Sequence, residues 1–162
     1  MARTGGGIPP VMSRFQDHFR PTIFGLADGM MSLLGVILYL LGHQDLIFLT
    51  AVSGAITSAL SMGGSEFLSD SDNGLRASAI MGGATGIGAI LPALPFAFMH
   101  GTPAFVLMIA ISFVIAVGVG CIRAKARGKK ITVFTVGSTV LLFAIIIAVG
   151  SLVTVFLPGG AG

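Results

Sequence analysis

Residues with metal-binding chemistry lie one helical turn apart near the end of a long apolar run. In "ALSMGGSEFLSDSDN" (59–73), the thioether of Met62 precedes the carboxylate of Glu66 by four residues, and Asp70 and Asp72 follow. A spacing of four places side chains on one face of an α-helix. Carboxylate oxygens bind divalent cations broadly, whereas a thioether favours softer transition metals. The segment therefore predicts a path for a transition-metal ion.

A further carboxylate, Asp28, lies inside another apolar run, "FGLADGMMSLLGVILYLL". A carboxylate within a membrane span costs roughly 2.5 to 3.5 kcal/mol on insertion scales, so such acids usually face a polar path. The alternative is an interfacial acid that is hydrogen-bonded to its neighbours near the start of a helix. We favour the functional interpretation and expect Asp28 to lie near the depth of Met62, on the antiparallel neighbouring helix.

Small and polar residues continue along the run that contains Met62. One stripe repeats every four residues and consists of Gly54, Ser58, Met62, Glu66 and Asp70. A second row beside it consists of Ser53, Thr57, Ser61, Ser65 and Ser69. Hydrogen bonds between packed helices are one explanation for the hydroxyls. They do not explain Met62 beside Glu66, and the two rows together are not typical of a lipid-facing helix.

The composition indicates the class of protein that carries these residues. Of 162 residues, 54% are hydrophobic and 9% are charged, whereas soluble domains are about a quarter charged. We predict an all-α integral membrane protein with five transmembrane helices, because five apolar runs approach the required length of about 20 residues. They cover approximately residues 23–41, 46–68, 75–99, 104–122 and 131–157. The breaks are short, so consecutive helices should be antiparallel.

The basic residues predict the orientation. With five spans and a cytoplasmic N-terminus, all nine lysines and arginines fall on the cytoplasmic side. This agrees with the excess of lysine and arginine that cytoplasmic loops carry in membrane proteins. The C-terminus, with a tail at 159–162, would then lie outside. The net charge of +3 needs no nucleic-acid partner, because membrane orientation accounts for it.

Residues 1–22 form an N-terminal arm that precedes the transmembrane domain, 23–158. The arm lacks the apolar run of a secretory signal peptide, so we expect it to remain on the protein. Its apolar residues recur at helical spacing and are Val11, Met12, Phe15 and Phe19. This pattern is typical of a short amphipathic helix lying in the membrane interface.

Small residues predict close packing of the third span. In "MGGATGIGAI", Gly82 and Gly86 are four residues apart, and Ala79 and Gly83 widen the smooth face. Such spacing lets membrane helices approach closely, whereas a phosphate-binding loop would require a strand before the helix. The prolines of "LPALP" (91–95) should kink or end this helix.

Catalytic chemistry has little support in the sequence. No histidine lies within a predicted span, and the single cysteine, Cys121, lies at the basic edge of the fourth. We therefore expect neither a nucleophilic enzyme nor a permanent cofactor. His43 and His100, on the predicted outer side near Asp45, are expected to be solvated, with an exit-side metal contact as the less favoured alternative.

Three segments resemble the vacuolar iron transporter family. "GLADGMMSLLGVI" (25–37) resembles its first-span Asp-Gly motif, and "SGAITSALSMGGSEFLS" (53–69) resembles its second-span motif of small residues, Ser-Met-Gly and Glu-aromatic. "LRASAIMGGATGIGAILPALPF" (75–96) is similar to its third span. The last two spans and "RAKARGKK" (123–130) fit in position and character.

The resemblance implies a homodimer that exports Fe(II), with Mn(II) as an alternative cargo, from the cytoplasm in exchange for protons. It implies a path between the subunits, lined by the first two spans, in which Asp28 and Met62 match the in-membrane metal residues. Glu66 matches an acid at the cytoplasmic mouth. We expect the location to be a prokaryotic plasma membrane.

The chain departs from the family pattern at two places. Family members commonly insert a cytoplasmic metal-binding domain between the second and third spans, where this chain has only "SDSDNG". Capture of the metal would then depend on Glu66, Asp70 and Asp72, or on an outside partner. Some members also carry an acid two turns before the methionine, where this chain has Gly54.

Two other functions fit the same residues. A small dimeric proton-coupled exporter of organic cations would also need a membrane carboxylate, but it should offer aromatic faces to its cargo. This chain has no tryptophan and one tyrosine, Tyr39. A non-transporting accessory subunit would be consistent with the missing insertion, and an intact dimer without metal binding would favour it.

Overall fold

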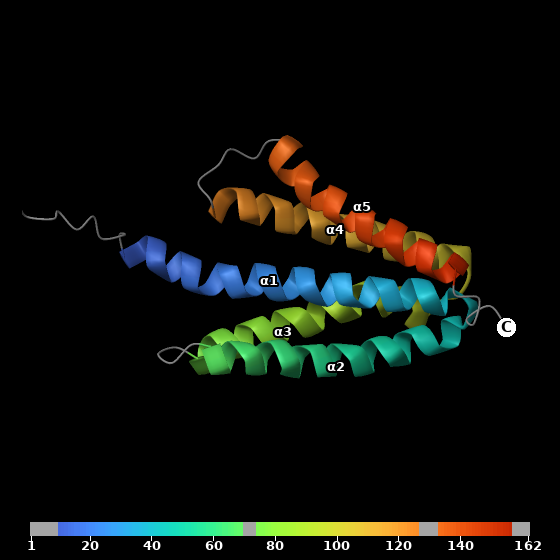
Figure 1. The fold of residues 1–162 in the computed structure, drawn as a ribbon, viewed down its shortest axis with the longest axis horizontal. Helices are drawn as coiled ribbons and strands as arrows, with labels where there is room; N and C mark the ends of the chain where they lie inside the picture. Colours follow the sequence, from blue (N-terminus) through green and yellow to red (C-terminus); the bar gives the residue numbers. More distant parts are fainter. Residues whose placement is uncertain (1–9, 70–73, 127–132, 157–162) are drawn as a thin grey trace, which may run out of the picture.

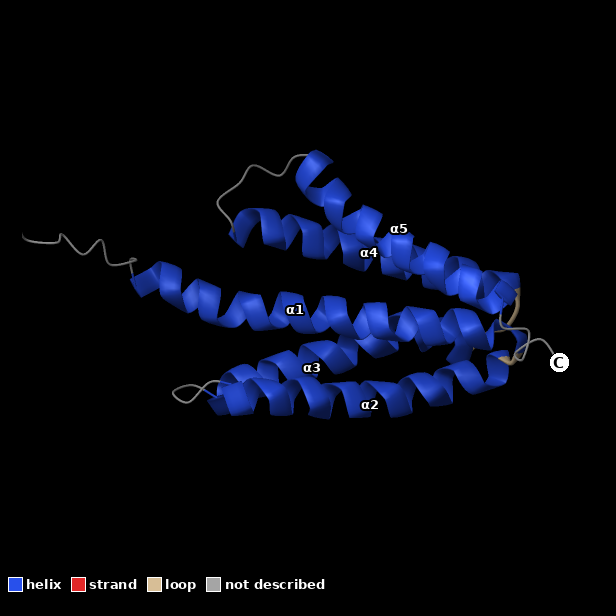
Figure 2. Ribbon diagram, in the orientation of Figure 1, coloured by secondary structure: helices blue, strands red, loops and turns tan. Residues whose placement is uncertain are grey.

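The chain folds as a bundle of helices. The computed structural model describes residues 10–69, 74–126 and 133–156, and within these ranges it contains no strand (Figures 1 and 2). The α-helices are α1 (Pro10–Tyr39), α2 (Gln44–Ser69), α3 (Gly74–Ala93), α4 (Thr102–Ala126) and α5 (Val133–Phe156). Two short 3-10 helices are η1 (Leu40–Gly42) and η2 (Leu94–Ala97). The all-α prediction is confirmed for the described residues, and consecutive helices run antiparallel (Figure 1).

Four of the helical segments are long and apolar enough to cross a membrane. They are Phe19–Gly42, Gln44–Ser69, Gly74–Ala97 and Thr102–Ala124, and they correspond to the first four predicted spans. At the position of the predicted fifth span, the described apolar stretch of α5, Val136–Leu152, is shorter. These helices are compatible with a multi-pass integral membrane protein.

No break separates the predicted arm from the first span. α1 begins at Pro10 and continues through Pro21 to Tyr39. Proline is tolerated in the first turn because its missing N–H would have no partner there. Pro21 removes one hydrogen bond from the helix interior without ending the helix. The residues predicted as an interfacial helix are thus the first turns of α1, and residues 1–9 lie outside the described ranges.

α3 packs against α1 through backbone contacts that glycine permits. A Cβ added to Gly25 would collide with the carbonyl oxygen of Met81, and one added to Gly29 would collide with that of Thr85. The Thr85 hydroxyl is buried and donates a hydrogen bond of 2.9 Å to the Met81 carbonyl. Close approach of this kind is the usual role of small residues in membrane helices.

The neighbouring face of α3 packs against α2 in the same way. A Cβ on Gly82 would lie 2.6 Å from the carbonyl oxygen of Ala59, and one on Gly86 would lie 3.5 Å from the Ala59 Cβ. The predicted close packing is therefore confirmed at Gly82, whereas a Cβ at Gly86 would make only an ordinary contact. Gly83 takes no part, since a Cβ there would meet nothing within 4 Å.

The proline-rich segment ends α3, as predicted. Pro92 is buried within the last turn of the helix, which stops at Ala93. The chain then tightens into η2, where Pro95 lies near the start. Proline has no N–H to continue the ladder of hydrogen bonds, so the tighter turn follows.

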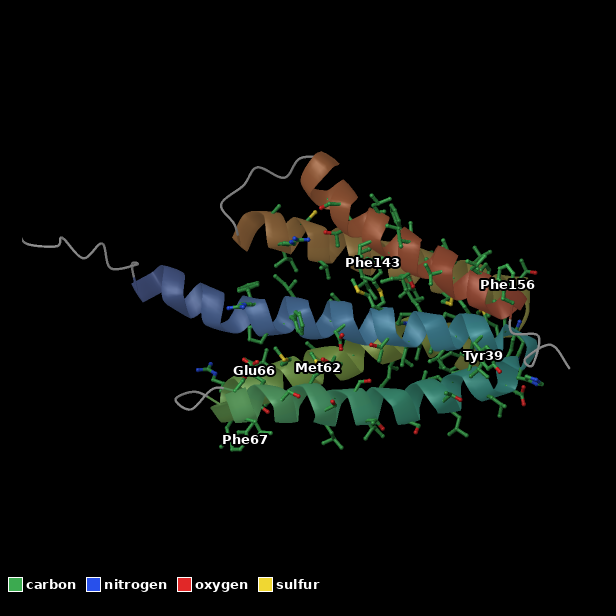
Figure 3. The ribbon with its side chains drawn as sticks, in the orientation of Figure 1. Tyr39, Met62, Glu66, Phe67, Phe143 and Phe156 are labelled. Carbon is green, nitrogen blue, oxygen red and sulfur yellow. The ribbon has the colours of Figure 1, made fainter. Side chains whose placement is uncertain are left out.

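Larger apolar side chains fill the half of the bundle nearest η1. Met30 and Leu34 of α1 are completely buried, together with Met108 of α4, and Ile47 of α2 is almost completely buried. Phe143 of α5 joins the same cluster from the α4–α5 pair, which lies against α1 (Figure 3).

At this end of the bundle, a hydrogen bond joins the start of α2 to the connection that precedes α4. The backbone N–H of Gly101 donates to Oε1 of Gln44 over 2.5 Å. Gly101 has a φ of 76°, a conformation that favours glycine. We call this the Gln44 end; the opposite end, where α2 stops and α3 begins, is the Glu66 end.

Candidate functional site

Asp28 lies on α1 between two glycines whose contacts with α3 exclude a side chain. Gly25 and Gly29 on either side of it meet the α3 backbone at Met81 and Thr85, and the Asp28 side chain itself is half-buried. The two glycines leave no room for side chains between the helices. They therefore fix the height of the carboxylate relative to α3.

Met62 and Glu66 lie along one edge of α2, and Phe67 lies on the opposite edge (Figure 3). The edge that carries Met62 and Glu66 faces α1 in this view, whereas the Phe67 ring is 50% exposed. The described members of the predicted stripe share one environment, because Gly54, Ser58, Met62 and Glu66 are all half-buried. The stripe is thus one continuous edge of the helix, and at Gly54 it approaches the side chain of Leu33.

The second polar row lies on a different face of α2. Its members are all exposed, and they are Ser53, Thr57, Ser61, Ser65 and Ser69. The Thr57 hydroxyl donates 3.0 Å to the Ser53 carbonyl, and the Ser69 hydroxyl donates 3.0 Å to the Glu66 carbonyl. The row is therefore a polar face that the described part of the chain leaves uncovered.

A contact that the sequence did not predict holds α2 beside Met62. The Ser78 hydroxyl of α3 donates a hydrogen bond to the carbonyl oxygen of Gly63. Gly63 is buried, and a Cβ there would lie 3.1 Å from the Ser78 carbonyl oxygen. The bond links the two helices at the residue that follows Met62 in the chain. The only signal in the sequence is the one-turn spacing of Ser78 and Gly82.

The glycine contacts give the relative heights of Asp28 and Met62. Gly29 lies opposite Thr85 and Ala89 of α3, whereas Gly63 lies opposite Ser78 and Gly82. Because α1 runs parallel to α3 and α2 runs antiparallel, Asp28 and Met62 differ by about five α3 residues, or about 7 Å along the axis. The predicted similar depth is thus refined to an offset of about a turn and a half, with Asp28 further from the Glu66 end.

The direction of helical side chains favours closing this offset. Side chains in an α-helix lean toward the N-terminus of their own helix. The N-terminus of α1 lies at the Glu66 end and that of α2 lies at the Gln44 end. Along the bundle axis, Asp28 and Met62 are therefore each expected to lean toward the level of the other.

The remaining predicted ligands are less constrained. Asp70 and Asp72 lie outside the described residues. Within the described ranges, no group of three or more His, Cys, Asp and Glu side chains is placed to hold a metal ion. At the Gln44 end, the Gln44–Gly101 bond brings the segment of His43 beside that of His100.

Comparisons of the chain with protein-family models, with curated protein sequences and with solved structures find no match.

Proposed function

We propose that this chain exports Fe(II), with Mn(II) as an alternative cargo, from the cytoplasm in exchange for protons. One observation carries the proposal: Asp28 of α1 and Met62 of α2 both lie beside glycines that fix their helices to neighbouring faces of α3. A carboxylate within an apolar span is costly and usually functional. Its combination with a thioether favours a transition metal over magnesium or calcium.

The proposed path begins at the Glu66 end, which faces the cytoplasm of a prokaryotic cell. Glu66, Asp70 and Asp72 attract the divalent cation there. The half-buried edge of α2 leads from Glu66 to Met62, one helical turn further into the bundle. Asp28, about a turn and a half beyond Met62, receives the ion next.

A homodimer supplies the ligands that one subunit lacks. Each described subunit brings two carboxylates and one thioether to this path, and a two-fold axis would double the set. The exposed row from Ser53 to Ser69 supports the dimer, because five hydroxyl-bearing residues on one face are unusual toward lipid. In the dimer this row faces the second subunit.

Protons compete with the metal for the same oxygens. A carboxylate must lose its proton to bind a cation, so metal release and protonation are coupled. Entry of a proton from the outer side would thus displace the ion from Asp28. Export should therefore accelerate when the outer solution is more acidic than the inner one.

Five spans complete the proposed topology, with the N-terminus in the cytoplasm. α5 is a helix of 24 residues, which corresponds to about 36 Å. This length exceeds the hydrocarbon core of about 30 Å. With the N-terminus in the cytoplasm, the five-span topology places every lysine and arginine on the cytoplasmic side.

The test is metal flux in proteoliposomes across a pH gradient. Asp28→Asn should abolish both Fe(II) flux and its pH dependence, because the amide cannot exchange a proton. The matched control is Asp45→Asn, an equivalent change at the exposed Gln44 end, which should leave flux unchanged. Fe(II) flux at the original rate in Asp28→Asn would refute the mechanism.

Binding experiments separate the other functions. Competition of a lipophilic organic cation with Fe(II) for the purified dimer would identify an exporter of organic cations. An intact dimer that binds neither cation in titration calorimetry would identify an accessory subunit.

A further inference from the structure

Three arginines surround the Glu66 end on three different helices. Arg20 lies on α1, Arg76 on α3 and Arg123 on α4. They are all the lysines and arginines whose side chains the structure describes; Arg20 and Arg76 are exposed, and Arg123 is half-buried. None of them forms an ion pair with a described carboxylate.

The arginines lie at one level when measured along their helices. From Gly42 back to Arg20, and from Ala97 back to Arg76, the helices rise about 34 Å. From Thr102 to Arg123 it rises about 32 Å. Each distance is close to the hydrocarbon thickness of a bilayer, about 30 Å. If the Gln44 end lies at one membrane surface, all three guanidinium groups lie in the headgroup layer of the other leaflet.

The chemistry of this layer fits the arginines. A guanidinium is planar and always charged, and it presents paired N–H donors that match phosphate oxygens. The described residues at the Gln44 end include no lysine or arginine. The orientation rule counts positive charge near the ends of spans and makes no distinction between lysine and arginine or between helix and loop. Arginines fixed on three helices at one height offer a specific phosphate-binding surface.

We propose that Arg20, Arg76 and Arg123 bind the phosphate groups of anionic phospholipids in the leaflet at the Glu66 end. The inference rests on the membrane location of the chain and not on its cargo. Electrostatic attraction of this kind contributes about fivefold in partitioning per basic residue near an anionic surface. It weakens as salt shortens the screening length.

The bound lipids would also act on the proposed path, because Glu66 lies at the same level. From Asp45 to Glu66, α2 rises about 32 Å, as α4 does between Thr102 and Arg123. Arginines at the level of Glu66 repel a divalent cation. Anionic headgroups offset this positive charge, so they raise the concentration of cations at the mouth.

The experiment compares the full chain in nanodiscs of phosphatidylcholine with nanodiscs of equimolar phosphatidylcholine and phosphatidylglycerol. Thermal unfolding and the phosphatidylglycerol retained after purification are measured. A triple variant, Arg20→Gln, Arg76→Gln and Arg123→Gln, is compared with a control that removes equal charge from other positions on the same side of the membrane, Arg3→Gln, Arg14→Gln and Lys129→Gln.

The wild-type chain should unfold at a higher temperature in the anionic nanodiscs and retain phosphatidylglycerol. The first triple variant should lose both effects, with about a fivefold loss of retained lipid per arginine, whereas the control should keep them. No preference in the wild type, or an equal loss in the control, would overturn the proposal. If the glutamine variant does not insert, lysine at the three positions keeps the charge, and undiminished retention would overturn the role of the guanidinium groups.

Fe(II) flux in vesicles of the same two compositions separates this inference from the transport function. A preference for phosphatidylglycerol without any flux would overturn the transport function and leave the lipid surface standing. Flux that is equal in both compositions, with no lipid preference, would overturn the lipid surface alone.

Discussion

Replacing Gly29 by alanine should test whether the backbone contact between α1 and α3 sets the structure of the bundle. The new Cβ would collide with the Thr85 carbonyl oxygen and lie 2.8 Å from the Thr85 carbonyl carbon and 3.0 Å from the Ala89 nitrogen. Ordinary van der Waals contact begins at 3.4 Å, so the Thr85 carbonyl carbon must move away by about 0.6 Å. The Thr85 carbonyl oxygen is closer to the new Cβ and must move further. These are backbone atoms, and they can move only if the two helices separate.

The expected magnitude follows from two opposing effects. Overpacking costs typically about 1 to 3 kcal/mol, and contact with backbone atoms of two α3 residues places Gly29 near the upper value. Alanine returns up to about 1 kcal/mol because it is the better helix former. We therefore expect Gly29→Ala to lower the free energy of unfolding by about 2 kcal/mol.

Gly35 lies on the same helix as Gly29, and a Cβ there meets nothing within 4 Å. Gly35→Ala is therefore the matched control. It should raise the free energy of unfolding by about 0.5 to 1 kcal/mol. The assay is reversible unfolding in mixed micelles, with helicity followed by circular dichroism. Equal effects of the two substitutions would refute the proposed packing of α1 on α3.

Three further substitutions test other contacts in the same assay. Thr139 carries a buried hydroxyl with no partner among the described residues, so Thr139→Val should stabilise the fold by about 1 kcal/mol; a loss of stability would contradict this. Ser78→Ala removes the bond to the Gly63 carbonyl and should cost about 0.6 kcal/mol, whereas no change would show that the bond does not hold α2. Gln44→Ala should cost about 1 kcal/mol by freeing the Gly101 N–H, and Gln44→Glu, which keeps the acceptor, should retain most of the stability.

The sequence was sufficient for the helical class and for most helix boundaries. Apolar runs and short polar breaks are local features, and α2 begins and ends within two residues of the predicted span. Pro92 and Pro95 marked the end of α3 because proline acts on its own turn. The start of α1 was less predictable. From the sequence, Pro21 is expected to separate the N-terminal arm from the first span, but α1 continues through it.

The stripe on α2 was predictable and the height of Asp28 was not. Residues four apart share a helix face wherever the helix lies, so Met62 and Glu66 could be grouped from their spacing alone. The offset between Asp28 and Met62 depends on how α1 and α2 each fit α3. That fit is set by contacts such as Gly29 with Thr85, more than fifty residues apart in the chain, which no local pattern reveals.

The small residues of α3 link stability to the candidate site. Helices with ordinary side chains at their contacts pack with axes about 8 to 10 Å apart, whereas the backbones of α1 and α2 approach that of α3 closely enough to exclude a Cβ. Because α1 and α2 lie on neighbouring faces of α3, a larger residue at Gly29 or Gly82 would push Asp28 and Met62 apart as it separates the helices. Fe(II) flux and stability should therefore fall together in Gly29→Ala. A variant that lost stability and kept full flux would show that the metal path does not depend on this packing.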